Sequence, residues 1–394
     1  MKNKRQIGIG ELRITPRGRQ LVNQVLRNNR LSYGPFHQKL ERMFAKEHEV
    51  RFSIFTNSGT SALQIALHAL KSKFHWADGD EVIVPAVTFV ATANIVLSCG
   101  MKPVFVDVEP DSYNINPRLI EKALTRRTRC LIPVHLLGLP ADMDPILAIA
   151  RRHRLKVIED SCETMFARYK GCKVGSMGDI GCFSTYTAHF LVTGVGGLVT
   201  TNDEELHIKM RSLMNHGRDP IYLNIDDDNR ADPQRLKKIV ARRFSFVDIG
   251  YSYRCTELEA SLGVAQMEEK NKILQGRKRS AEYLTHHLKG LSEELQLPAT
   301  FADRDHVFML YGLTLKNQPK SGLVNFLERR NIETRDLFPL VNQPIYKDLF
   351  GPGLEKKFPV ARFLNNHSFY ISCHQYLTKK DLDYMVKAFY DYFR

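Results

Sequence analysis

The chain has 394 residues, 43% of them hydrophobic and 25% charged; 57 lysines and arginines against 43 aspartates and glutamates give a formal net charge of +14. This length exceeds what one hydrophobic core usually serves, and the composition excludes an intrinsically disordered chain. No apolar run approaches the roughly 20 residues that a membrane helix needs. The basic N-terminus is not followed by the apolar stretch of a signal peptide, so a cytoplasmic protein is expected.

Alternating helices and strands are predicted over the first two-thirds of the chain. Helices are predicted at residues 61–73, 117–125 and 145–153. Strands are predicted at residues 81–86, 103–108, 130–136 and 155–160. Each is a short run of residues with high β propensity that ends at a turn or a polar residue. Continuously apolar strands separated by helices indicate a largely parallel sheet covered on both faces. Two further strands, at residues 181–185 and 197–201, follow each other closely enough to form an antiparallel edge.

The remainder of the chain has a different organisation. Segment 222–235 is acidic and then polar, which predicts an exposed loop. A long amphipathic helix is predicted from about residue 256 to residue 288, and a smaller α+β unit follows it. We therefore predict a large α/β domain over residues 1–255 and a linking helix with a small domain over residues 256–394.

The positive charge and the cysteines restrict the classes of partner. Basic clusters such as residues 151–154 are short, dispersed and not interleaved with aromatic residues, so a nucleic-acid partner is not expected. Attraction of a polyanionic small substrate and weak contact with an anionic membrane surface both fit the charge. The seven cysteines are scattered and never spaced Cys-x-x-Cys, which indicates neither a disulfide framework nor a metal site.

Three segments whose residues could bind a ligand or take part in catalysis fall at the ends of predicted strands, where open parallel sheets bind ligands. Residues 57–63 form a small-polar turn that opens a helix, which suits a phosphate and equally an ordinary helix cap. Asp160 ends a strand, where a carboxylate can keep the pyridine nitrogen of pyridoxal phosphate protonated or simply cap the next turn. Within residues 178–197, Ser184 can bond a phosphate, and several glycines allow close backbone approach.

The order and spacing of these segments resemble the sugar aminotransferase family, fold-type-I enzymes that act on nucleotide-linked 4-keto-6-deoxyhexoses. The likeness covers nearly the whole chain, with further matching segments at residues 33–35, 85–92, 106–108, 135–138, 250–257 and 332–335. The resemblance implies an α/β fold with a mostly parallel mixed sheet flanked by helices and a smaller C-terminal α+β domain. It also implies pyridoxal or pyridoxamine phosphate as cofactor and a homodimer with active sites at its interface.

The resemblance further assigns roles to particular residues. It implies that Phe89 stacks on the cofactor ring, that Asp160 meets its ring nitrogen, and that its phosphate is held by Ser58, Gly59, Thr60 and Ser184. Glu163 stands where relatives often carry glutamine near the cofactor's phenolic oxygen. Ser252 stands where many carry an asparagine that reaches the neighbouring subunit's phosphate. Candidate substrate residues are Tyr33, His216, Arg254 and Arg335, although Arg254 and Arg335 equally suit structural ion pairs.

His189 is the main departure from the family pattern. The family's transaminases carry at this position the lysine that binds the cofactor covalently, and here no lysine lies between Lys173 and Lys209. Imidazole forms no lasting bond of that kind, but it moves protons near neutral pH. A similar exchange of lysine for histidine marks the family's sugar 3-dehydratases. One of their branches also binds an iron–sulfur cluster through cysteines that residues 220–254 lack, so the chain resembles the colitose-type branch without a cluster.

The resulting interpretation is C3 dehydration of a nucleotide-linked 4-keto-6-deoxyhexose, with glutamate as amino donor and His189 as base and then acid. The resemblance points to O-antigen-type dideoxysugar synthesis and leaves the nucleotide and the hexose unnamed. Two alternatives remain open. One is amine transfer from pre-formed pyridoxamine phosphate, and the other is a non-catalytic descendant that only binds a ligand. Retention of Gly59, Thr60, Asp160 and Ser184 counts against the latter.

Overall fold

The computed structural model describes residues 6–223, 229, 231–337 and 339–394. Its centre is a seven-stranded sheet in the order β1-β9-β8-β5-β4-β2-β3. These strands are β1 Phe52–Thr56, β2 Glu81–Pro85, β3 Lys102–Val106, β4 Thr128–Leu131, β5 Lys156–Asp160, β8 Ile180–Ser184 and β9 Gly197–Thr201. Only β9 runs antiparallel to its neighbours β1 and β8, so the sheet is mixed and mostly parallel.

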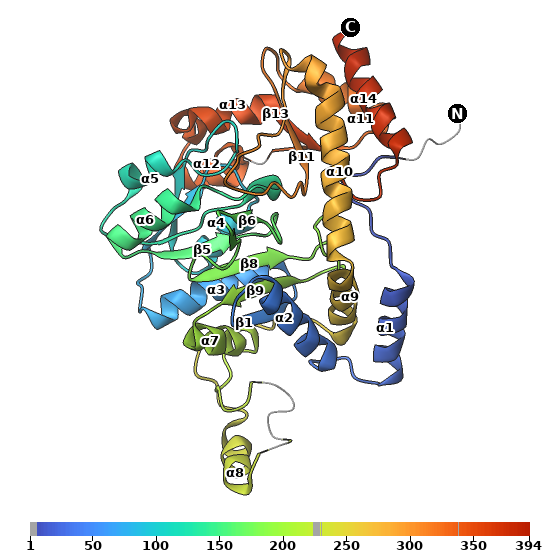
Figure 1. Cartoon of the computed structure of the whole chain (residues 1–394). Coiled ribbons are helices and arrows are strands. Elements are labelled where there is room, and N and C mark those ends of the chain that lie inside the picture. The colour runs from blue at the N-terminus through green and yellow to red at the C-terminus, as the bar shows by residue number, and fades with distance from the viewer. Residues whose placement is uncertain (1–5, 224–228, 230, 338) are drawn as a thin grey trace.

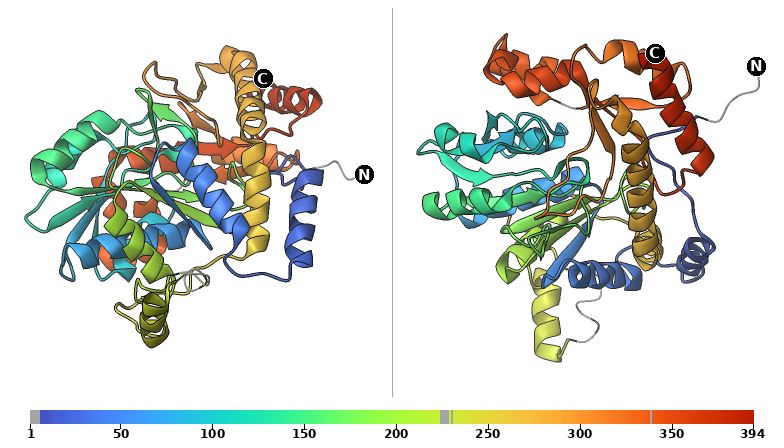
Figure 2. Two further views of the ribbon diagram at one scale, coloured as in Figure 1. Left: turned by 60° about the horizontal axis from the view of Figure 1, so that its bottom comes forward. Right: turned by 45° about the horizontal axis from the view of Figure 1, so that its top comes forward.

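Helices cover both faces of this sheet (Figures 1 and 2). The helices in the first two-thirds of the chain are α1 Pro16–Arg27, α2 Pro35–Glu47, α3 Gly59–Lys73, α4 Ala91–Ser98, α5 Pro117–Ala123, α6 Met143–His153, α7 Glu204–Met214 and α8 Pro233–Arg242, of which α8 projects away from the sheet (Figure 1). Helices α5 and α6 pack on one face through a cluster that includes Ile120 and Ile146. Helix α3, almost wholly buried, packs on the other face against β5, β8 and β9. None of the described helices is long and apolar enough to cross a membrane.

A second, smaller sheet lies in the C-terminal part. It is antiparallel in the order β10-β11-β13-β12, with β10 Leu295–Gln296, β11 Tyr311–Leu315, β12 Thr334–Asp336 and β13 Ser368–Ile371. A two-stranded ribbon, β6 Arg168–Tyr169 and β7 Cys172–Lys173, belongs to the large part. The C-terminal helices are α9 Glu257–Glu268, α10 Lys270–Leu288, α11 Ser321–Glu328, α12 Pro344–Phe350, α13 Pro359–His367 and α14 Lys379–Phe393.

Each of the two hydrophobic cores includes residues from the other part of the chain. Ile7 packs into the smaller core and forms a bridge with Ile332. Conversely, Tyr346 of α12 and Leu364 of α13 pack into the larger core. The proposed domain division between residues 255 and 256 stays a prediction.

The mostly parallel mixed sheet flanked by helices confirms the predicted α/β class, and three details of the prediction need correction. The sheet edge is β1, which was not predicted, and the antiparallel strand β9 lies one position inside it. The long helix is two helices, because Glu269 leaves helical geometry between α9 and α10. Residues 233–235 of the predicted loop begin α8, where the Asp232 side chain accepts the first free amides. Residues 224–228 and 230 of that loop lie outside the described residues.

Candidate active site

A cavity of about 430 Å³ opens where β5 and β8 end and α3 begins. It brings together most of the residues selected from the sequence: Ser58, Gly59, Thr60, Phe89, Asp160, Glu163, Ser184 and His189. Other lining residues come from the N-terminal segment and from in or next to the smaller sheet, namely Ile9, Met309, Leu310 and Tyr370. Both parts of the chain therefore build the cavity.

The start of α3 forms one end of this cavity. Ser58 caps the helix, with its Oγ accepting from the amide of Ser61 at 3.0 Å. A Cβ on Gly59 would lie 2.8 Å from the Cβ of Ser184 and 2.9 Å from the Sγ of Cys162. Glycine is needed here because the helix start lies tight against the end of β8. The helix dipole and the neighbouring hydroxyls make this end suitable for a phosphate.

Asp160 lies deeper in the cavity, where it is 3% exposed. Its Oδ2 accepts from Thr92 Oγ1 at 2.8 Å, and its Oδ1 accepts from the amide of Cys162 at 3.2 Å. Burial raises the pKa of Asp160, and these two hydrogen bonds oppose the rise. Among the described residues no lysine or arginine forms an ion pair with it. A bound ring with a protonated nitrogen would supply the missing positive charge, so the residues present fit pyridoxal phosphate.

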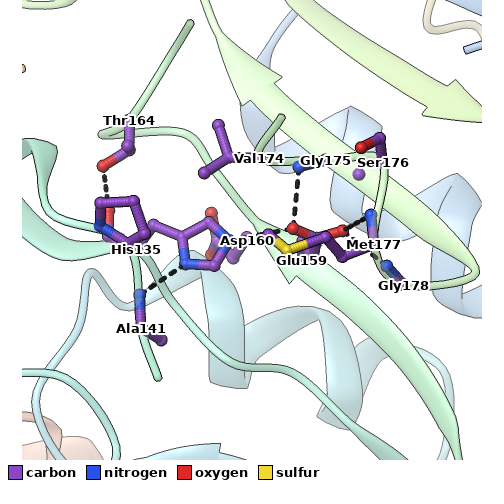
Figure 3. Close-up of polar contacts among 12 residues, drawn as sticks. His135, Ala141, Glu159, Asp160, Thr164, Val174, Gly175, Ser176, Met177 and Gly178 are labelled. Atoms are coloured by element: carbon purple, nitrogen blue, oxygen red, sulfur yellow. Dashed lines mark hydrogen bonds and ion pairs between the residues drawn. The ribbon is translucent and has the colours of Figure 1, made fainter. Parts of the chain in front are cut away.

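A buried polar network behind Asp160 holds the end of β5 in place (Figure 3). His135 Nδ1 accepts from the amide of Ala141 at 3.0 Å, so its Nε2 carries the proton that is donated to Glu159 Oε2 at 3.1 Å. Glu159 also accepts the amides of Gly175, Met177 and Gly178 at 2.8, 2.7 and 2.6 Å. The amide of His135 donates to the carbonyl of Asp160 at 3.0 Å. Glu159 was not among the residues predicted from the sequence, although a glutamate beside Asp160 in a buried strand was a signal.

His189 lines the cavity on the loop after β8. Its amide donates to the carbonyl of Tyr186 at 2.9 Å, and its buried Nδ1 has no hydrogen-bond partner among the described residues. Burial, and secondarily the charge of Arg277, lower the pKa of His189 to about 4. The imidazole is therefore neutral near pH 7 and able to accept a proton.

The other selected residues do not line this cavity. Tyr33 and Arg254 line a second cavity of about 390 Å³. Arg254 also contacts Ser252 and His216. Its Nη2 donates to Ser252 Oγ at 2.9 Å and lies 3.2 Å from His216 Nε2. Arg335, on β12, forms an ion pair with Glu333 and lines neither cavity. This ion pair agrees with the alternative prediction, in which Arg335 has a structural role. The roles assigned to all these residues stay predictions.

A model of the DegT/DnrJ/EryC1/StrS aminotransferase family matches residues 13–390. The chain belongs to this family. Among its curated relatives, a GDP-perosamine synthase of Caulobacter vibrioides is 35% identical over 361 residues, covering 91% of this chain and 90% of the relative. A dTDP-4-dehydro-2,6-dideoxy-D-glucose 3-dehydratase of Saccharopolyspora spinosa is 32% identical, covering 91% and 80%.

Solved structures share the fold of this chain. The aminotransferase from Psychrobacter cryohalolentis superposes with a TM-score of 0.86 at 30% identity, covering 96% of this chain and 97% of that one. This similarity confirms the fold-type-I aminotransferase architecture and the expected family. The curated relatives bear names of both amine-transferring and dehydrating enzymes, so the family alone does not select the reaction.

Glu163 gives this DegT-family protein a pH-dependent stability. Its Oε2 accepts from the amide of Leu137 at 2.9 Å, while burial, and to a lesser extent the charge of Asp160, raise its pKa from 4.5 to about 7. Between these two pKa values the folded protein binds more protons than the unfolded chain. The free energy of unfolding therefore falls as pH rises through this window.

We expect Glu163→Gln to remove about 2 kcal/mol of this fall between pH 5 and pH 8. Urea unfolding of the cofactor-free wild type and variant at both pH values measures it. The buried Asp160 contributes a change of the same sign to both proteins, so the difference between them reports Glu163. Equal pH dependence in the two proteins would contradict the assignment.

Proposed function

We propose that this chain catalyses the C3 dehydration of a nucleotide-linked 4-keto-6-deoxyhexose with a vitamin-B6 cofactor. The observation that carries the proposal is a neutral histidine, His189, in a cavity that also contains Asp160, Ser184 and the start of α3. Among the residues that the structure describes, no lysine lines this cavity. A site that holds the cofactor without a covalent lysine bond suits its amine form, pyridoxamine phosphate.

The residues of the cavity divide the binding of that cofactor among them. Ser58, Gly59, Thr60 and Ser184 would hold the phosphate, Phe89 would cover the ring, and Asp160 would face the ring nitrogen. Ser252 would reach the site of the neighbouring subunit in a homodimer. When bound, the ring supplies an electron sink, which Asp160 strengthens by keeping the nitrogen protonated.

His189 performs the proton transfers in this proposal. As a neutral base it takes a proton from the cofactor's C4′ carbon, next to the reacting nitrogen, and as an acid it gives a proton to the C3 hydroxyl as that group leaves. One residue serves both steps because imidazole exchanges protons readily near neutral pH. Overall the sugar loses one oxygen, while glutamate is oxidised to 2-oxoglutarate with release of ammonia. No iron–sulfur cluster is required for this balance.

The names of the relatives support a nucleotide sugar as the substrate. The GDP-perosamine synthase and the dTDP-sugar 3-dehydratase both have nucleotide-diphosphate sugars in their names. The net charge of +14 suits a diphosphate, since a basic protein concentrates anionic ligands around it. Tyr33, His216, Arg254 and Arg335 remain the candidates for contacts with the substrate or with the neighbouring subunit, and we expect the enzyme to act in the cytoplasm.

Amine transfer from pyridoxamine phosphate is the second candidate function. It is favoured by the 35% identity to a relative whose name denotes synthesis of an amino sugar. In that case His189 would move protons in the same cavity, and the nitrogen would remain on the sugar. The two functions differ in the fate of that nitrogen.

Mass spectrometry of the reaction products separates these functions. The protein is incubated with pyridoxal phosphate, glutamate and a panel of nucleotide-4-keto-6-deoxyhexoses. We expect a sugar product lighter by one oxygen, with ammonia released in equal amount. An aminated sugar without ammonia release would establish amine transfer and reject dehydration.

A further inference from the structure

We propose that Arg277, a buried arginine on α10, is a positioning residue for His189. The proposal rests on the role proposed above for His189. Arg277 is 2% exposed and lies behind the cavity wall. Its Nη2 donates to the carbonyl of His189 at 3.2 Å, and its Nη1 donates to the carbonyl of Met309 at 2.6 Å.

The two bonded carbonyls belong to two segments that are far apart in the sequence and both line the cavity. His189 follows β8 of the large sheet, whereas Met309 immediately precedes β11 of the small sheet, and both line the cavity. Helix α10, which Figure 1 shows running from beside the large sheet up into the C-terminal part, therefore binds both segments through one guanidinium. The planar fork of arginine bonds two acceptors at a fixed separation, which the single ammonium of lysine does not reproduce.

Burying the charged side chain of Arg277 costs free energy that a purely structural role would not explain. Among the described residues no carboxylate forms an ion pair with it, and its buried Nε has no hydrogen-bond partner. Burial lowers the pKa of the guanidinium, and Cys373 and Tyr376 act weakly against this decrease. The face of Phe190 lies 5.0 Å from the guanidinium carbon. Removing an unpaired cation from water costs several kcal/mol, and an apolar side chain of similar volume would pack there at lower cost. Because the charge is not explained by packing, we infer that it acts electrostatically on neighbouring groups.

That effect falls on the imidazole of His189. After burial, the charge of Arg277 is the next influence that lowers the pKa of His189, and so keeps the ring in the form that accepts a proton. The other titratable groups around the ring are Asp160, Glu163 and Tyr370, which line the same cavity, and Tyr186, whose ring centre lies 6.5 Å away. The backbone of Tyr186 raises the pKa of His189, and the charge of Arg277 opposes that influence.

Three variants test this role in the cofactor-free full-length protein: Arg277→Met, Arg277→Lys and the control Arg279→Met, an exposed position on the same helix. Hydrogen–deuterium exchange reports the segments at residues 186–192 and 307–311. Histidine NMR reports the titration of His189, assigned as the signal that is missing in His189→Asn. Neither measurement requires activity.

We expect Arg277→Met to speed exchange in both segments on the order of tenfold and to raise the titration midpoint of His189 by about one pH unit. Arg277→Lys should speed exchange but leave the midpoint near that of the wild type, and Arg279→Met should change neither. A midpoint unchanged in Arg277→Met, or shifted equally in Arg277→Lys, would overturn the proposal. If Arg277→Met does not fold, unchanged exchange in Arg277→Lys overturns it. These shifts in a protein without dehydratase activity would retain the positioning role and reject the proposed function.

Discussion

Replacing His189 with lysine is expected to lower the rate of C3 dehydration by about 100- to 10,000-fold, the usual contribution of a general acid–base group. Lysine would bind the cofactor covalently, as in the family's transaminases, and would draw it back from the amine form. We therefore expect the variant to gain amine transfer. The measurement is the ratio of deoxygenated to aminated sugar by mass spectrometry, with retention of cofactor absorbance after dialysis.

The variant His189→Asn is the matched control, because it removes the base without adding an amine. We expect it to lose dehydration to a similar extent, to gain no amine transfer and to release the cofactor on dialysis. Dehydration retained in His189→Lys would reject the proposed mechanism. Loss of dehydration in His189→Lys without any covalent retention of the cofactor would show that the loop after β8 does not direct residue 189 at the cofactor.

Sequence patterns predicted strands that contain a short apolar run bounded by a turn or a polar residue. Strands β2 and β5 are almost wholly buried runs that end at a polar residue or a turn, and both were found within a residue or two of their bounds. Strand β1 was missed because polar Ser53 and Thr56 interrupt its apolar residues, and their burial depends on pairing with β9 far along the chain. The break at Glu269 involves neither proline nor glycine, so local preference did not reveal it.

Some residues of the candidate site could likewise be predicted from the sequence, and others could not. Residues of the cavity wall, such as Gly59 and Asp160, were found because they lie in short motifs at strand ends. Supporting residues were missed because their partners are backbone groups, which sequence does not display. Glu159 is bound by amides of the turn at residues 175–178, and Arg277 by carbonyls of two distant segments. An arginine on an amphipathic helix ordinarily indicates an exposed position, and only the tertiary structure shows that Arg277 is buried.

Replacing Asp160 with asparagine is expected to change activity and stability in opposite directions. The variant retains the local hydrogen bonds, since its carbonyl can accept from the amide of Cys162 and its NH₂ can donate to the Thr92 hydroxyl. Without the negative charge the ring nitrogen of the cofactor is no longer held protonated. We expect the dehydration rate to fall about 100- to 1,000-fold, the typical loss for one group that stabilises charge in the transition state.

The cofactor-free form of this variant should in turn be more stable than the wild type at neutral pH. Burial raises the pKa of Asp160, so the ionised carboxylate is unfavourable in the folded protein, and the neutral amide relieves that cost. Urea unfolding at pH 7.5 should show a gain of about 0.5–2 kcal/mol, within the range found when functional sites lose a destabilising group. A structural carboxylate would give the reverse result, in which stability falls together with activity. The sign of the stability change therefore distinguishes a carboxylate kept for the cofactor from one kept for the fold.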